Sequence, residues 1–159
     1  MDTSPANPKT SSRQTEKPES TILLVEDETV VRQVTRAVLE HAGYRVLECD
    51  GPEEALRVGS EHRDHIGLLL SDVVMPGMNG HELALRLQSL QPGLITVFMS
   101  GYADRDVLHN VLHKMTQDGM TNYIQKPFTI NVLLSRVAAA LRTRAEFSEA
   151  APPSGIPTG

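Results

Sequence analysis

The chain has 159 residues, a formal net charge of −5 and a single cysteine, Cys49. This length suits one domain with a sizeable core, and the lone cysteine excludes an internal disulfide. The acidic balance and the lack of a Lys/Arg run argue against direct nucleic-acid binding, and no apolar run of about 18 residues predicts a membrane span. With no export signal either, we predict a cytoplasmic protein that contacts neither nucleic acid nor membrane.

Both ends of the chain differ in composition from the middle. Residues 1–20 hold three prolines and no large aliphatic residue after Met1, and the last nine residues hold three more prolines. Such segments cannot bury enough apolar surface to offset the entropy lost on ordering. We expect a disordered arm at 1–20, a folded domain at 21–145 and a disordered tail at 146–159.

Within the folded part, short apolar runs alternate with stretches whose apolar residues recur at helical spacing. Gly43 is placed to end the first helix, and Pro52 to begin the second. The expected strands cover residues 21–27, 44–50, 66–72, 93–100 and 121–125, and the expected helices cover 28–43, 52–62, 80–90, 104–115 and 129–144. The order is five strand–helix units, (βα)5.

Strands that are apolar along their whole length, each followed by a helix, predict an α/β fold with a doubly wound, five-stranded parallel sheet. Helices then cover both faces of the sheet. In such sheets the functional site lies outside the carboxyl ends of the strands. The residues that end each strand are therefore the candidates for a site.

Charged and hydroxyl side chains stand at four of these strand ends. They are Glu26 and Asp27, Asp72, Ser100 and Lys126. Crowded carboxylates repel one another unless they share a cation, and oxygen ligands of this kind suit Mg2+. The set is typical of phosphoryl transfer, with Asp72 as the nucleophile that forms an aspartyl phosphate. Asp27, with Glu26 mostly through water, would hold Mg2+, while Lys126 and Ser100 would contact phosphoryl oxygens.

Four motifs occur in order at these strand ends: LLVEDE at 23–28, LLLSDVVMPGMNG at 68–80, VFMSGY at 97–102 and YIQKPF at 123–128. Together they resemble the receiver domain of two-component response regulators, and especially receivers attached to hybrid sensor histidine kinases. The resemblance covers about residues 21–144. It implies a flavodoxin-like sheet with strand order 2-1-3-4-5.

The resemblance also implies roles for matched residues. Asp72 would accept a phosphoryl group from a histidine of a partner histidine kinase or histidine phosphotransfer protein. Glu26, Asp27 and the backbone carbonyl of Val74 would complete the Mg2+ site with Asp72. The chain would then be a signalling phosphoacceptor that catalyses only its own phosphorylation and slow dephosphorylation, not an enzyme with a separate substrate.

A switch is implied at the next two strand ends. Ser100 would turn toward the phosphoryl group and Tyr123 would rotate inward, which changes the surface of the fourth helix, fifth strand and fifth helix for a downstream protein. Lys126 would bind the phosphoryl group, and its peptide bond to Pro127 would be cis.

Two positions differ from an arrangement that speeds loss of phosphate. Val74 lies two residues after Asp72, and Tyr102 lies two residues after Ser100. Polar groups at these places could position an attacking water, so we expect Val74 and Tyr102 to slow dephosphorylation. The interval from Ser100 to Lys126 is also longer than expected, which bears on the output surface.

Other interpretations are open at this point. Residues 26–28 could form a solvated loop, Ser100 could be a turn residue, Lys126 a surface charge and Tyr123 simple packing. A receiver-like module could signal by binding alone. An aspartyl-phosphate hydrolase would want a second acid where this chain has Val74, and a nucleotide or flavin binder would want a GxGxxG or GxxxxGK[ST] loop, which is absent.

Overall fold

A sheet of five strands forms the centre of the molecule. The computed structural model describes residues 21–101, 109–111, 113–114, 117 and 122–150, with side chains as far as residue 143. The strands are β1 (Thr21–Val25), β2 (Arg45–Cys49), β3 (Leu68–Asp72), β4 (Ile95–Ser100) and β5 (Tyr123–Gln125). The helices are α2 (Thr29–His41), α3 (Pro52–Glu61), α4 (Gly80–Leu90) and α6 (Ile130–Ala150).

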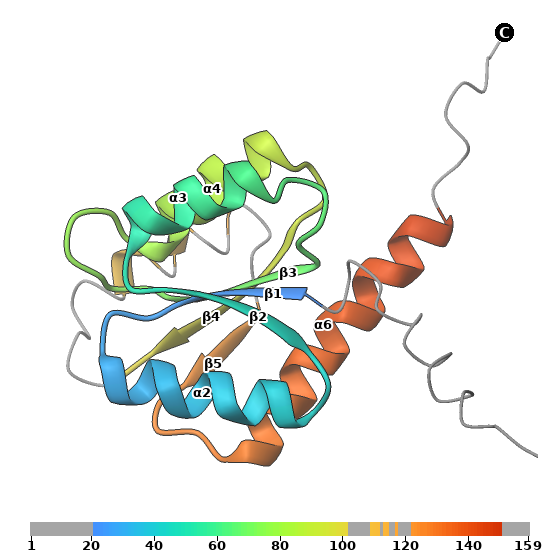
Figure 1. The fold of residues 1–159 in the computed structure, drawn as a ribbon. Helices are drawn as coiled ribbons and strands as arrows, with labels where there is room; N and C mark the ends of the chain where they lie inside the picture. The colour runs from blue at the N-terminus through green and yellow to red at the C-terminus, as the bar shows by residue number, and fades with distance from the viewer. Residues whose placement is uncertain (1–20, 102–108, 112, 115–116, 118–121, 151–159) are drawn as a thin grey trace, which may run out of the picture.

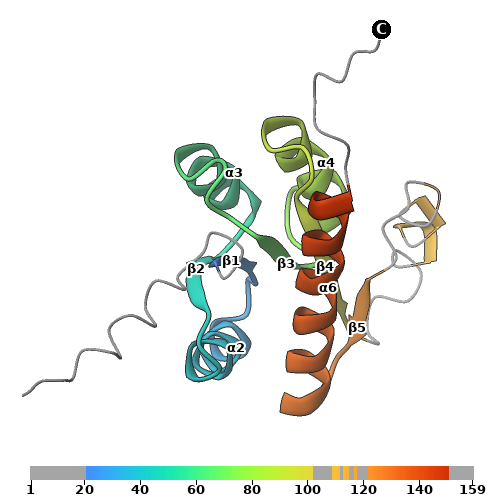
Figure 2. The same cartoon turned by 90° about the vertical axis from the view of Figure 1, so that its right-hand side faces the viewer.

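The sheet topology agrees with the expected fold class. The strands lie in the order β2-β1-β3-β4-β5, and every neighbouring pair is parallel. Helices α3 and α4 cover one face of the sheet, and α2 and α6 cover the other (Figure 1, Figure 2). Since Val25 of β1 pairs with Ser71 of β3, the next residues along the two strands, Glu26 and Asp72, come out side by side. The doubly wound parallel sheet is thus confirmed. Glu26 and Asp72 lie next to each other at its carboxyl edge.

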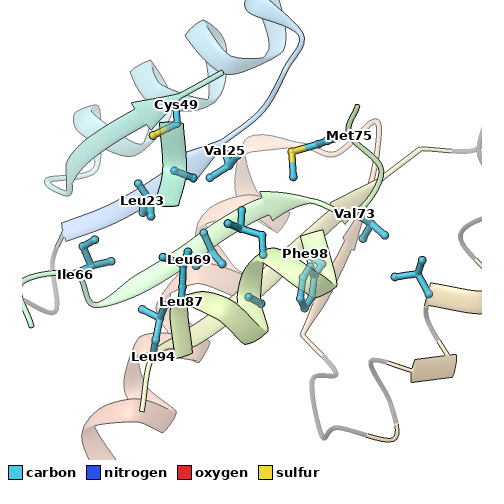
Figure 3. Packing of buried hydrophobic residues seen from close by; sticks show 14 residues of the cluster. Leu23, Val25, Cys49, Ile66, Leu69, Val73, Met75, Leu87, Leu94 and Phe98 are labelled. Carbon is cyan, nitrogen blue, oxygen red and sulfur yellow. The ribbon is translucent and has the colours of Figure 1, made fainter. Parts of the chain in front are cut away.

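Alternate strand residues pack into two separate apolar cores. Leu23, Leu69 and Phe98 are fully buried beneath α3 and α4 (Figure 3). Ile22 and Leu70, one position along from Leu23 and Leu69, are fully buried beneath α2 and α6. Because burial of apolar surface stabilises by roughly 25 cal/mol per Å², both cores fix the strands whose ends carry the polar residues.

The exposed side of α2 differs from what its sequence suggests. Val31, Val34 and Val38 recur at helical spacing, yet Val34 is 58% exposed, and Val30 beside it is 71% exposed. Thr35 takes a buried place instead. A helical period identifies an apolar stripe, but it does not say how far the neighbouring elements extend over that stripe. Apolar surface is therefore left on α2 next to the carboxyl edge of the sheet.

The last helix continues further than expected. Helix α6 ends at Ala150, beyond the helix end expected at residue 144. The sequence RAEFSEA at 144–150 has neither Gly nor Pro, whereas Pro152 and Pro153 cannot continue a helix. Among the helices that the structure describes, none is long and apolar enough to cross a membrane. Most of the helix expected at 104–115 lies outside the described residues. Within that range, residues 109–111 and 113–114 are described, and they are helical.

Gly80 begins α4 directly against the end of β3. A Cβ at this position would lie 2.1 Å from the carbonyl oxygen of Asp72. We expect Gly80→Ala to lower the free energy of unfolding by about 1–3 kcal/mol, because the main chain must move to admit the methyl group. Chemical denaturation measures the change, with Gly101→Ala as the control, since a Cβ there would meet nothing within 4 Å. Equal losses in the two variants would contradict this account.

Candidate functional site

Four strand ends bring the expected polar residues to one place. Glu26 and Asp27 follow β1, Asp72 ends β3, Ser100 ends β4 and Lys126 follows β5. All but Glu26 line a cavity of about 570 Å³. Glu26 is fully buried, so its side chain is not part of a solvated loop. The chain thus places Asp27, Asp72, Ser100 and Lys126 around a single cavity, with Glu26 buried in contact with Lys126.

Lys126 joins the two buried carboxylates. Its Nζ donates to Glu26 Oε1 at 2.8 Å and lies 2.7 Å from Asp72 Oδ1. The other oxygen of Glu26, Oε2, accepts from the backbone N–H of Glu28 at 3.1 Å. Asp72 Oδ1 is buried and has no hydrogen-bond partner among the described residues, so its contact with Lys126 is an ion pair without hydrogen-bond geometry. The Asp72 carboxylate is thus held in place beside the ammonium group of Lys126.

The environment of Asp72 disfavours its charge. Burial, followed by the neighbouring Glu26 carboxylate, raises the pKa of Asp72 to about 9, although Lys126 acts in the opposite direction. Burial by itself would lower the pKa of Lys126, but Asp72 and Glu26 outweigh burial and raise that pKa. Two carboxylates and one ammonium leave an excess of negative charge, which a bound cation would offset.

The donor set suits a hard divalent cation. One carboxylate oxygen from each of Glu26, Asp27 and Asp72 lies within 4.8 Å of the others. Both oxygens of Glu26 are already used by protein donors, which fits contact through water better than direct ligation. Asp27 is exposed, and Asp72 Oδ1 lacks a hydrogen-bond partner in the described part of the chain. Oxygen ligands that leave room for several waters suit Mg2+, so the residues present fit this ion.

Ser100 and Tyr123 are in direct contact. The Ser100 hydroxyl donates to the Tyr123 hydroxyl at 2.6 Å. Ser100 is buried, and Tyr123 is half-buried against the core beneath α3 and α4. The sequence suggested a role for each residue but not this bond between them. It connects the end of β4 to β5 immediately beside the cavity.

The remaining sequence-predicted positions are divided between the cavity and the undescribed part of the chain. Val74 lines the cavity, and it brings no carboxyl group there. The Lys126–Pro127 peptide bond is cis, the isomer that the resemblance implies. Tyr102 lies outside the described residues, as does much of the segment between Ser100 and Lys126.

Two features of the site were missed from the sequence. Arg32 of α2 donates to the backbone carbonyl of Glu26 at 2.8 Å. A main-chain acceptor leaves no trace in the sequence, so this contact had no signal. Val30 and Val34 form exposed apolar surface beside Phe128. The sequence did carry a signal for this surface, because the apolar stripe of α2 is wider than the face that the helix buries.

Comparisons with known proteins agree with this arrangement. The sequence pattern of the response regulator receiver domain matches residues 22–138. The sensor kinase CckA of Brucella abortus is 34% identical over 122 residues, which are 77% of this chain and 12% of that protein. The response regulator protein FleR of Pseudomonas aeruginosa is 35% identical over 117 residues, which are 74% of this chain and 24% of that protein. The chain thus spans a minor part of the length of these relatives.

Solved structures give the same result. A response regulator receiver domain protein from Clostridium thermocellum superposes with a TM-score of 0.72 at 25% identity, over 80% of this chain and 98% of that one. The receiver domain of the hybrid histidine kinase CckA gives a TM-score of 0.63 at 32% identity, over 76% of this chain and 98% of that one. The fold, the strand-end residues and the match along 22–138 therefore lead to one conclusion. The chain belongs to the response regulator receiver domain family of two-component signalling.

Proposed function

We propose that the chain is a phosphoacceptor whose Asp72 receives a phosphoryl group from a phosphohistidine of a partner protein. An Asp72 carboxylate oxygen forms a bond to phosphorus while the bond from phosphorus to the donor's imidazole nitrogen breaks, and the imidazole leaves with that electron pair. The observation that supports this most directly is Asp72 Oδ1. This buried oxygen lies 2.7 Å from Lys126, and Asp72 lines the cavity, so its carboxylate is held beside a positive charge where a phosphoryl group can enter.

The residues around Asp72 supply the electrostatic part of the reaction. Mg2+, when bound by Asp27, Asp72 and the Val74 carbonyl, with Glu26 through water, would neutralise charge on the phosphoryl oxygens. Lys126 stabilises the ionised Asp72 before transfer and is placed to offset the charge of the phosphoryl group afterwards. Burial of the cluster strengthens these interactions relative to water.

Phosphorylation changes the partner of Ser100. Its hydroxyl donates to Tyr123 now, but a phosphoryl oxygen on Asp72 is a charged and hence stronger acceptor. When Ser100 turns to the phosphoryl group, Tyr123 loses its partner and the surface formed by β5 and the neighbouring helices changes. Phosphate thereby biases an existing equilibrium between two arrangements.

This switch is tested by NMR with Mg2+ and beryllofluoride, which together imitate the phosphoryl group. We expect shifts of the Asp72, Ser100 and Tyr123 resonances in the wild type and none in Asp72→Asn. Ser100→Ala should still show the shift at Asp72 but lose most of the shift at Tyr123. Shifts confined to the acidic residues in the wild type would reject the switch while leaving the acceptor role intact.

Apolar surface next to the cavity is a candidate binding site for the phosphodonor. Val30, Val34, Pro127 and Phe128, called here the α2 patch, line a second depression of about 470 Å³. Gly101 and Lys126 line both this depression and the site, so the two are continuous. A donor histidine must reach Asp72 directly, and its protein must therefore cover the adjoining rim. We propose that the phosphodonor binds on the α2 patch, burying apolar surface there.

Val34→Asp tests this docking surface. The donor is the one that phosphorylates the wild type fastest in a panel of phosphorylated histidine kinases and phosphotransfer domains. We expect the variant to slow this transfer by at least about tenfold, because a carboxylate must be desolvated in the interface. Labelling by acetyl phosphate should not change. Leu85→Asp is the control, since Leu85 is 42% exposed on α4 at the opposite face of the sheet. Equal slowing by both variants would reject the α2 patch as the docking surface.

A further inference from the structure

Arg32 links the acidic site to the outer part of the sheet. Its Nη1 donates to the backbone carbonyl of Glu26 at 2.8 Å, and its Nε donates to Glu48 Oε1 on β2 at 3.2 Å. Glu48 is held in turn by Arg36, one helical turn along α2. The Arg32 side chain is only 16% exposed, so both of its contacts are partly shielded from water. One planar guanidinium thus joins the end of β1, α2 and β2.

The carbonyl that Arg32 binds belongs to the peptide unit between Glu26 and Asp27. On the other side of Glu26, the backbone N–H donates to the Cys49 carbonyl at 3.2 Å. The main chain of Glu26 is therefore fixed on both sides, by Cys49 and by Arg32. Asp27 follows immediately, outside the strand and exposed, so the direction of its side chain depends on how well this peptide is held.

We infer that Arg32 is a positioning residue for the Mg2+ site, acting through the Glu26–Asp27 peptide, and that Glu48 supports it by fixing the guanidinium. The inference rests on the proposed function, because it assumes that Asp27 is a metal ligand. Partners of this outer kind orient the ligands that touch a metal, and their loss typically weakens metal binding about 10- to 100-fold. Arg32 itself contacts neither the metal nor the phosphoryl group.

Electrostatics and positioning predict opposite results for the loss of Arg32. Removing a positive charge from beside an acidic site should by itself strengthen the binding of a cation. Loosening the Glu26–Asp27 peptide should weaken that binding, because the ligand geometry is no longer held. The sign of the change in Mg2+ affinity therefore separates a positioning residue from a neighbouring charge.

The test measures the dissociation constant for Mg2+ by NMR titration of the full chain. We expect Arg32→Met to weaken binding by about tenfold or more. Arg32→Lys keeps the charge but cannot donate from two nitrogens in one plane, so we expect it to bind Mg2+ clearly more weakly than the wild type. Arg36→Met is the matched control. Arg36 lies on the same helix and contacts the same Glu48, but not Glu26, so its loss should change the affinity less than about twofold.

A second readout needs no metal. In the metal-free protein, the amide resonance of Asp27 should shift or broaden in Arg32→Met and keep its place in Arg36→Met. Should Arg32→Met fail to fold, Arg32→Lys and Glu48→Gln provide the test, each expected to weaken Mg2+ binding. Unchanged or stronger binding in the folded Arg32 variants, with the wild type binding normally, would overturn this inference alone. A wild type that binds no Mg2+ would overturn the proposed function and this inference with it.

Discussion

Asp72→Asn should make the metal-free protein more stable at neutral pH, although it removes the residue on which the proposed function depends. The wild type must either bury an ionised carboxylate beside Glu26 or hold a proton that the unfolded chain would release. Both cost free energy, and the amide avoids both while Lys126 keeps its bond to Glu26. We expect the free energy of unfolding to rise by something on the order of 1–3 kcal/mol.

The pH dependence of this difference has a definite sign. The pKa of Asp72 is raised from 3.8 to about 9, so between these values the folded protein holds a proton that the unfolded chain has lost. Stability then falls as pH rises, because the unfolded state binds fewer protons. The advantage of Asp72→Asn should be small below pH 3.8, grow through neutral pH and level off above about 9.

Urea denaturation at several pH values in the presence of a chelator measures this effect. Mg2+ should stabilise the wild type increasingly as its concentration exceeds the dissociation constant, and it should stabilise Asp72→Asn much less. Asp50→Asn is the matched control, an exposed carboxylate whose loss should leave stability nearly unchanged. If Asp72→Asn were less stable than the wild type throughout the pH range, the buried Asp72 carboxyl group would not be destabilising the folded protein.

Lys126→Met should lower the free energy of unfolding by a large amount, opposite in sign to the effect of Asp72→Asn. Lys126 contacts Glu26 at 2.8 Å and Asp72 at 2.7 Å, and only 18% of its side chain is exposed. Removal of one partner from a buried ionic cluster leaves uncompensated charge and typically costs about 3–5 kcal/mol. We expect the lower end of this range, since Asp72 holds a proton at neutral pH and Glu26 is then the carboxylate left without its partner.

Thermal or chemical denaturation compares Lys126→Met with Lys114→Met, which removes an exposed ammonium and should change stability by less than about 0.5 kcal/mol. Because the pKa of Lys126 is raised by folding, its contribution is fully present below the ordinary value of 10.5 and is lost only as pH rises through the raised pKa. The loss in Lys126→Met should therefore persist through neutral pH. Equal stability of the two variants at pH 7 would contradict the geometry of the cluster.

The parallel sheet could be predicted because its signals are local. Ile22 to Val25 form an uninterrupted apolar run that ends in charge, which predicts a strand covered on both faces and a functional edge. The end of α6 was misjudged because no residue near 144 stops a helix, whereas the prolines at 152 and 153 do. The sequence did not show which side of α2 is buried. Whether Val34 or Thr35 faces the core depends on where the neighbouring elements end.

The site was predictable to the level of which side chains meet. Glu26 and Lys126 are separated by 100 positions, yet both follow strands of one parallel sheet, and topology brings them to one edge. Individual bonds were beyond the sequence. The bond from Ser100 to Tyr123 depends on side-chain rotation, and the bond from Arg32 to a backbone carbonyl depends on how closely α2 approaches β1.

Intact-mass spectrometry after incubation with acetyl phosphate and Mg2+ tests the central claim most directly. The proposal predicts a mass increase of one phosphoryl group in the wild type that requires Mg2+ and is absent in Asp72→Asn. Peptide mapping should place the group on Asp72. No adduct in the wild type, or an adduct that persists in Asp72→Asn, would contradict the assignment of Asp72 as the phosphoacceptor.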